Sequence, residues 1–183
     1  QVLSASQPGG ITDEQLRGAL EDAFSDCRDS LKKVLLLVPD YTRYHSDGGK
    51  IANMIYHMLK DTCQEDLLEA VGTHFAISDE QLESMYGDIP KERFIVHNWR
   101  TGVVKIGQVP ADFVAEVSEG VYCEPIDVEV SKYFYDGYDL ILSIGQVVPH
   151  EVIGMANHAK NLFVGVGGSD MINKSHMLGA IYG

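Results

Sequence analysis

Three histidines and a lysine lie close together in a glycine-rich segment, residues 144–176. They are His150, His158, Lys160 and His176, and they follow an apolar run that ends at a glycine. Imidazole titrates near neutral pH and ligates metals, and a lysine amine can form a covalent link to a cofactor. In open α/β sheets, sites are built where a strand ends and leads into a loop. We therefore expect this segment to carry much of the chemistry of the protein.

Three other apolar runs, at residues 34–38, 67–71 and 94–96, also end at polar loops. These loops contain Asp40 to Arg43, Thr73-His74 and His97 to Arg100. The carboxyl ends of the strands in a parallel sheet lie at one edge, so these loops and the loop with His150 are expected to meet in a single crevice.

Two pairs of residues in these loops each allow two interpretations. His74 and His150 could act as acid and base on opposite sides of a substrate carbon, or each could be a structural histidine that bonds to a backbone carbonyl. The expected convergence of the strand ends favours the catalytic interpretation. Arg43 could bind a carboxylate with its guanidinium fork, or it could form an ion pair with Asp40 that closes a turn. The pattern alone favours the ion pair.

Several residues are typical of structural roles when taken alone, and the motifs of some common binding sites are absent. Taken alone, Lys160 is typical of a solvated surface lysine, and His176 of a histidine that caps or packs a helix. His45, His57 and His158 are also assigned to structure. The sequence has no phosphate-binding loop with Gly-Lys-Ser/Thr, no Gly-x-Gly-x-x-Gly after the first strand, and no His-x-x-x-His pair. Ordinary NAD binding and a zinc hydrolase therefore gain little support.

Apolar spacing and capping signals predict helices that alternate with strands. Helices are expected at residues 13–31, 48–62 and 78–86, and the first and third open with capping boxes at Thr12 and Ser78. Strands are expected at residues 34–38, 67–71, 94–96, 140–144 and 162–166. Residues 103–120 should hold an extra strand or hairpin, and residues 127–133 either a strand or a crossover helix. The fold class predicted is α/β, with a largely parallel, Rossmann-like sheet flanked by helices.

Composition narrows the possible partners and location. The chain of 183 residues has 27 acidic and 14 basic residues, a formal net charge of -13. This argues against a nucleic-acid partner, because phosphate backbones are bound by basic faces. No apolar run approaches the roughly 20 residues that span a bilayer, so no membrane partner is expected. Three cysteines without a Cys-x-x-Cys motif suggest free thiols and a cytoplasmic location.

We expect residues 1–10 to form a tail and residues 11–183 to form one domain with its own core. The chain has no initiating methionine and ends soon after His176. We therefore expect it to be a fragment of a longer protein.

Five motifs in this order resemble those of the nickel-dependent lactate racemase family. They are Asp40-Tyr41-Thr42-Arg43, Gly72-Thr73-His74, His97-Asn98-Trp99, Pro149-His150 with Gly154 and Lys160, and Asn173 to His176. The resemblance extends from about residue 34 to residue 176 and corresponds to the N-terminal, cofactor-carrying domain of that family. It implies a second, C-terminal domain that is absent from this chain.

The resemblance implies a cofactor, the nickel-pincer nucleotide (pyridinium-3,5-bisthiocarboxylic acid mononucleotide nickel). Lys160 matches the lysine that is linked covalently to this cofactor, and His176 matches the histidine that completes the nickel coordination. Imidazole suits divalent nickel. Thr42 belongs to the same motif as a structural or cofactor-binding neighbour. The cofactor is expected to be absent from this fragment.

The resemblance also implies how a small 2-hydroxy acid or sugar acid would react. His74 and His150 match the two acid/base histidines, Arg43 matches the arginine that engages the substrate, and Asp40 matches the acidic residue beside it. One histidine removes the hydroxyl proton while the hydrogen on the same carbon leaves as hydride to the cofactor. The flat 2-keto acid takes hydride back on its other face, and the second histidine serves the opposite enantiomer.

The sequence departs from the family pattern near the anchoring lysine. The usual motif there is Gly-x-Ser-Gly-Gly-x-Lys, and here Asn157 and His158 stand in place of two glycines. Tyr44 also replaces the usual proline after the Asp-x-Thr-Arg motif. We expect a divergent branch with a reshaped cofactor loop, whose substrate need not be lactate.

The function expected is that of the N-terminal domain of a 2-hydroxy acid racemase or epimerase, which would be inactive as this fragment alone. One alternative is a non-catalytic domain that kept the fold and binds a small anion or a metal. The joint presence of His74, His150, Lys160 and His176 argues against it. Another alternative is a metal-dependent hydrolase or lyase that uses the same cleft, which predicts zinc or magnesium and no adduct on Lys160.

Overall fold

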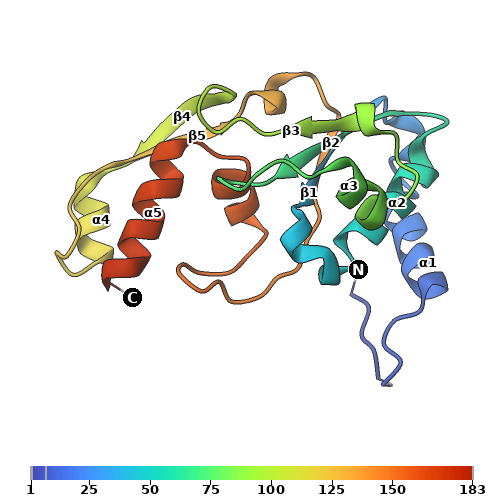
Figure 1. Cartoon of the computed structure of the whole chain (residues 1–183), viewed down its shortest axis with the longest axis horizontal. Coiled ribbons are helices and arrows are strands. Elements are labelled where there is room, and N and C mark those ends of the chain that lie inside the picture. Colours follow the sequence, from blue (N-terminus) through green and yellow to red (C-terminus); the bar gives the residue numbers. More distant parts are fainter. Residues whose placement is uncertain (1, 7, 183) are drawn as a thin grey trace.

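The computed structural model describes residues 2–6 and 8–182. Its centre is a sheet of four parallel strands in the order β3-β2-β1-β6 (Figure 1). The strands are β1 (Lys33–Pro39), β2 (Gln64–Ala70), β3 (Phe94–Val96) and β6 (Leu140–Ser143). The predicted α/β class with a largely parallel sheet is confirmed.

Three helices cover one face of the sheet: α1 (Asp13–Phe24), α2 (Gly48–Leu59) and α3 (Asp79–Tyr86). The two predicted capping boxes are formed, at Thr12 and Ser78. Helix α1 is shorter than predicted, since it ends at Phe24 and residues Arg28–Ser30 form a separate 3₁₀ helix. The hydroxyl of Ser25 donates to the carbonyl of Asp22 (2.9 Å), and such local bonds compete with continuation of a helix.

The central strand is buried on both sides, as a solid aliphatic run in a parallel sheet should be. Every residue from 34 to 38 has 0% of its surface exposed. Successive side chains of a strand point to opposite faces, so Val34 and Leu36 join the cluster under the three helices, whereas Leu35 and Leu37 join a second cluster on the other face.

Short helical turns lie against the second cluster, and one of them corrects the predicted strand at residues 162–166. The segment Asn161–Gly165 is a π-helical turn. Leu162 and Val166 pack into the cluster on this face, and the amide of Val166 donates to the carbonyl of Asn161 (2.9 Å). A short apolar run fits a buried helical turn as well as a strand, so its pattern could not decide between them.

A two-stranded antiparallel ribbon lies apart from the main sheet (Figure 1). It consists of β4 (Val103–Val109) and β5 (Ile126–Ser131), with helix α4 (Ala111–Val117) between them in the chain. The extra strand predicted within residues 103–120 is therefore confirmed. Of the two alternatives for residues 127–133, the strand is correct as far as Ser131, and a 3₁₀ helix, Lys132–Tyr135, follows.

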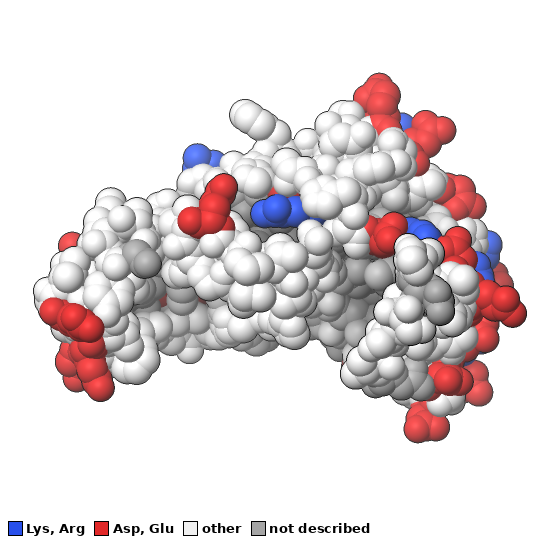
Figure 2. All heavy atoms as spheres, turned by 90° about the horizontal axis from the view of Figure 1, so that it is seen from below, with Lys and Arg blue, Asp and Glu red and all other residues white. Residues whose placement is uncertain are grey.

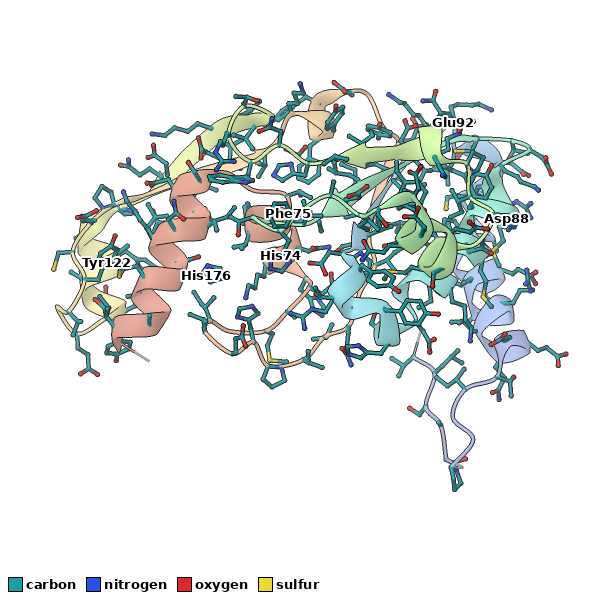
Figure 3. All side chains as sticks on the ribbon, viewed as in Figure 1. His74, Phe75, Asp88, Glu92, Tyr122 and His176 are labelled. Carbon is teal, nitrogen blue, oxygen red and sulfur yellow. The ribbon has the colours of Figure 1, made fainter. Side chains whose placement is uncertain are left out.

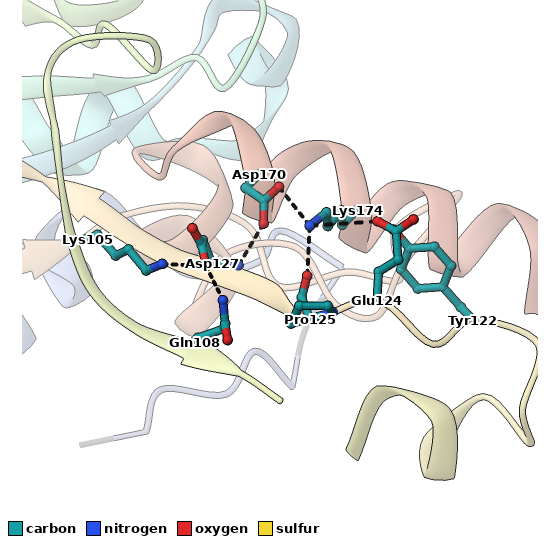
Figure 4. Close-up of polar contacts among 8 residues, drawn as sticks. All are labelled: Lys105, Gln108, Tyr122, Glu124, Pro125, Asp127, Asp170 and Lys174. Carbon is teal, nitrogen blue, oxygen red and sulfur yellow. Dashed lines mark hydrogen bonds and ion pairs between the residues drawn. The ribbon is translucent and has the colours of Figure 1, made fainter. Parts of the chain in front are cut away.

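Helix α5 (Ser169–Tyr182) is fixed to this ribbon by a polar network (Figure 4). The amide of Asp127 on β5 donates to the carboxylate of Asp170 (2.7 Å), and Nζ of Lys174 donates to the carbonyl of Pro125 (2.7 Å). Lys174 also forms an ion pair with Asp170 (3.1 Å). Because α5 carries His176, the network sets the position of that imidazole.

Acidic side chains outnumber basic ones on one face of the molecule. Figure 2 shows Asp and Glu gathered mainly toward the two ends of the face seen from below, with few basic side chains among them. This face therefore offers no continuous basic surface of the kind that binds nucleic-acid backbones. None of the helices within residues 2–6 and 8–182 is long and apolar enough to cross a membrane.

Candidate active site

A cleft opens at the carboxyl edge of the sheet, between loops that follow β1, β2 and β6. Its lining includes Asp40, Arg43, Thr73, His74, Gly145 and His150. Strands β2 and β3 lie on one side of β1 and β6 lies on the other, so the cleft is at the point where the strand order reverses. Open α/β sheets bind their ligands at this point. The predicted convergence is confirmed for three of the four loops.

His74 is held by a carboxylate. Its Nδ1 lies 2.7 Å from Oδ2 of Asp40. A carboxylate only accepts, so Nδ1 carries a proton and donates it, which leaves Nε2 of the neutral ring free to take a proton. Asp40 is 8% exposed, and its Oδ1 accepts hydrogen bonds from the amide (2.8 Å) and the hydroxyl (2.5 Å) of Thr42. Asp40 therefore fixes the tautomer and the orientation of His74.

His150 is held in the opposite way. Its Nδ1 accepts hydrogen bonds from the backbone amides of Val152 (3.2 Å) and Ile153 (3.3 Å). Because amides only donate, the neutral ring must carry its proton at Nε2. Burial lowers the pKa of His150, and the nearby charges of Lys160 and His176 lower it further. The imidazole is thus neutral near neutral pH and presents an N–H donor.

Two cationic side chains line the same cleft. Nζ of Lys160 donates to the carbonyl of Ile153 (3.1 Å). Burial is the main cause that lowers the pKa of Lys160 to about 8, and the charge of Arg43 is the second. Near neutral pH the amine therefore has a larger neutral, nucleophilic fraction than an ordinary lysine.

The guanidinium of Arg43 is not used in the turn that follows β1, although the backbone amide of Arg43 donates to the carbonyl of Asp40 (3.0 Å). Its ion pair with Asp40, which the bare pattern favours, is not formed, because Asp40 bonds to His74 and Thr42 instead. Within the described residues Arg43 makes no ion pair with any carboxylate. Its guanidinium is available to bind a carboxylate in the cleft.

His176 reaches the cleft from helix α5. Its Nδ1 donates to the carbonyl of Ile172 (2.7 Å), which leaves the lone pair of Nε2 free, as in histidines that ligate metals. Its ring centre is 5.6 Å from that of His150, with the ring planes at 88°. Figure 3 shows His176 on helix α5 and His74 on the loop that follows β2. Over the described part of the chain, no three His, Cys, Asp or Glu side chains group as metal ligands, so a metal here would need further ligands from a bound group.

The loop before Lys160 has the backbone of a glycine-rich segment. The φ angles of Gly154, Asn157 and His158 are 55°, 61° and 50°. This left-handed region favours glycine, and among other residues asparagine and histidine enter it most readily. Asn157 and His158, which replace two glycines of the motif given above, therefore keep the backbone conformation that glycines would allow. The side chain of His158 is exposed.

The loop after β3 does not line the cleft, so this part of the predicted convergence is wrong. His97 is buried (4% exposed), and its Nε2 donates to the carbonyl of Gly167 (2.8 Å). Burial lowers the pKa of His97, so the neutral ring packs under the turn before α5. His57 pairs with Asp88 (2.8 Å) away from the cleft, as its assignment to structure predicts.

Sequence reasoning missed two residues next to the candidate site. Asn161 lines the cleft, and Ser143 at the end of β6 bonds to both Asn161 and Asn157. The available signal was Asn157, which stands where the family motif has glycine, followed by a second asparagine directly after Lys160.

Comparison with known proteins gives one family. The family described as the lactate racemase N-terminal domain matches residues 11–182. The crystal structure of a protein from Thermotoga maritima is similar with a TM-score of 0.85 and 26% identity, over 97% of this chain and 43% of that one. The structure of the lactate racemase apoprotein from Thermoanaerobacterium thermosaccharolyticum shares the fold, with a TM-score of 0.60 and 20% identity over 84% of this chain and 36% of that one. No curated protein matches. The chain spans less than half the length of either structure.

Proposed function

This chain belongs to the lactate racemase N-terminal domain family, and from that premise we propose that it serves a 2-hydroxy acid racemase or epimerase. The observation that carries the proposal is the pair of histidines in one cleft. His74 is held as a proton acceptor by Asp40, and His150 is held as a hydrogen-bond donor by backbone amides. A reaction that interconverts a hydroxyl and a carbonyl needs both kinds of group at the substrate oxygen.

The residues of the chain divide the work on a small 2-hydroxy acid or sugar acid as follows. Arg43 binds the substrate carboxylate with its guanidinium fork. Nε2 of His74 takes the hydroxyl proton, and the carboxylate of Asp40 stabilises the imidazolium that results. The Nε2–H of His150 polarises the oxygen of the flat 2-keto acid. For the opposite enantiomer His150 is the base, and its ring must first release the amides of Val152 and Ile153 and shift its proton.

The residues present fit the nickel-pincer nucleotide. Lys160 supplies an amine with a lowered pKa for a covalent link, and Nε2 of His176 is free to ligate nickel. When bound, this group would supply a reversible hydride acceptor for the substrate carbon. Thr42 contributes through Asp40, because its hydroxyl and its amide both bond to that carboxylate.

We also propose that residues 11–183 form the N-terminal, cofactor-carrying domain and that a C-terminal domain of the same protein closes the cleft. Two kinds of observation support this. The similar structures are more than twice as long as this chain. Apolar side chains are exposed beside the cleft and at the end of α5: Phe75 is 96% exposed, Met177 53% and Ile181 46%.

The test is intact-mass spectrometry with nickel analysis on the full-length protein, co-expressed with the enzymes that make the pincer cofactor. The expected result is a nickel-containing adduct that maps to Lys160, and interconversion of the enantiomers of at least one acid in a panel of 2-hydroxy acids. An unmodified chain without nickel, beside a loaded positive control, would overturn the cofactor assignment and leave a non-catalytic binding domain as the better account.

A further inference from the structure

A short series of hydrogen bonds ties the loop before Lys160 to the end of β6. The hydroxyl of Ser143 donates to Oδ1 of Asn157 (2.6 Å), and Nδ2 of Asn157 donates to the carbonyl of Gly145 (2.9 Å). Nδ2 of Asn161 donates to the hydroxyl of Ser143 (2.9 Å). Residues before and after Lys160 are therefore anchored to the same strand end.

We call this set of hydrogen bonds among Ser143, Asn157, Asn161 and the carbonyl of Gly145 the anchor. The small size of Gly165 leaves room for it. A Cβ at Gly165 would lie 2.5 Å from Oδ1 of Asn161 and 3.2 Å from Cβ of Ala70. A larger residue at position 165 would displace the Asn161 side chain from its place beside Ser143. The anchor thus depends on space as well as on polar atoms.

The anchor also acts on a backbone conformation that is costly for most residues. Asn157 has a left-handed φ of 61°, and its two side-chain hydrogen bonds offset the strain of that conformation. His158 has a similar φ of 50°, but its side chain is exposed and forms no hydrogen bond within the described residues. Substitutions at positions 157 and 158 can therefore distinguish the effect of the left-handed backbone from the effect of the side-chain hydrogen bonds.

We propose that Asn157 is a positioning residue that, with Ser143 and Asn161, holds the loop so that Lys160 is placed in the cleft before any cofactor arrives. A loop with glycine at both left-handed positions has more conformations to lose when its lysine is fixed. Here part of that ordering is already present in the free chain. The link to cofactor attachment rests on the proposed function, whereas the anchoring of the loop does not.

Two variants that weaken the anchor are each paired with a control that leaves it intact. Asn157→Gly keeps the left-handed backbone available and removes both side-chain bonds. His158→Gly makes the same change at the adjacent position, where no such bond exists, and is the matched control. Ser143→Ala removes the shared hydroxyl, and Ser143→Thr retains it.

The first readout is amide hydrogen exchange of residues 154–161 in the full chain without cofactor. We expect Asn157→Gly and Ser143→Ala to speed exchange there by roughly tenfold, the effect of losing one or two hydrogen bonds in a local opening. We expect His158→Gly and Ser143→Thr to change it less than twofold. Unchanged exchange in Asn157→Gly, or equal acceleration in His158→Gly, would overturn the proposal.

The second readout is the fraction of full-length protein with an adduct at Lys160 after co-expression with the enzymes that make the pincer cofactor. We expect Asn157→Gly and Ser143→Ala to lower this fraction at least twofold, and Ser143→Thr to restore it. Faster exchange with an unchanged adduct fraction would show that the anchor only stabilises the loop, and would overturn the positioning of Lys160. If the unsubstituted protein forms no adduct, the proposed function fails, and faster exchange confined to Asn157→Gly and Ser143→Ala still supports the anchor.

Discussion

The two sides of the cleft hold their histidines by different means. On one side the His74 ring donates to the side chain of Asp40, which is itself fixed by Thr42. On the other side the His150 ring accepts from two amides of its own loop and lies among positive charges. Two histidines at one edge of one sheet thus hold their ring protons on different nitrogens, because their hydrogen-bond partners differ.

The two histidines also differ in whether their hydrogen-bond partners can be removed by substitution. A side-chain partner such as Asp40 can be replaced singly, whereas the amides that hold His150 belong to the backbone. In the neutral tautomers that these bonds select, Nε2 of His74 can accept a proton, whereas Nε2 of His150 can do so only after the ring releases the two amides. The two halves of the proposed reaction should therefore respond differently to the same kinds of change.

The largest effect is expected from replacing either histidine in the complete, cofactor-loaded protein. His74→Gln and His150→Gln should each lower racemisation by about 10²–10⁴-fold, because each removes a group to which the proposed reaction assigns proton transfer. The fall must be equal from both enantiomers, since the equilibrium constant of a racemisation is one. Formation of the 2-keto acid in a single turnover is the sharper measurement, and each variant should lose it from a different enantiomer.

A matched control for these variants is His158→Gln, which changes an exposed histidine of the same loop. Its racemisation rate should stay within about twofold of the unsubstituted protein. Loss of keto-acid formation from both enantiomers in the same histidine variant would remove the distinction between the two sides of the cleft.

A smaller but still large effect is expected from Asp40→Asn. The amide can no longer hold the Nδ1 proton of His74 as a carboxylate does, nor stabilise the imidazolium, so racemisation should fall at least roughly tenfold. The enantiomer affected in single turnover should be the one that His74→Gln affects. Asp88→Asn is the control, because Asp88 also pairs with a histidine, His57, but away from the cleft (2.8 Å). Equal losses in both variants would contradict a specific contribution of Asp40.

The smallest effect concerns stability and belongs to the His150 side. The pKa of Lys160 in the folded chain is about 8, below its ordinary 10.5. Below pH 8 the folded state thus holds an ammonium that is better solvated when the chain unfolds, and this cost disappears as the pH rises from 8 to 10.5. Lys160→Met should raise the melting temperature of the cofactor-free chain at pH 7 by about 2–4 °C, the shift that roughly 1 kcal/mol gives in a domain of this size.

The pH dependence distinguishes this gain from a general effect of removing charge. The difference between Lys160→Met and the unsubstituted chain should shrink as the pH rises from 8 to 10. Lys60→Met, at an exposed position on the surface, should leave the melting temperature unchanged at every pH. A melting temperature that falls in Lys160→Met at pH 7 would show that the amine stabilises the fold and is not held at a cost.

Much of the fold could be predicted because burial leaves a direct mark on sequence. The run at residues 34–38 is wholly aliphatic since both faces of β1 are covered, and capping boxes at Thr12 and Ser78 mark where two helices start. The pattern failed at residues 162–166, because a short buried apolar run does not distinguish a strand from a helical turn. It also overextended α1, whose end is set by local bonds of Ser25.

For the candidate site, sequence order predicted which loops meet but not what each side chain contacts. Arg43 and Asp40 are close in sequence and suggest an ion pair, yet Asp40 bonds to His74, which lies 34 residues further along the chain. The tautomer of His150 depends on backbone amides that every sequence contains. His97 follows a strand as the other candidates do, but its burial under Gly167 depends on a segment far along the chain.

The measurement that tests the central comparison most directly is ¹⁵N nuclear magnetic resonance of the imidazole rings in the cofactor-free chain. His74→Gln and His150→Gln assign the two signals, and the spectra are recorded between pH 7 and 8. The predicted result is a proton on Nδ1 of His74 and a proton on Nε2 of His150. The same tautomer in both rings would contradict the account, because the two sides of the cleft would then hold equivalent groups.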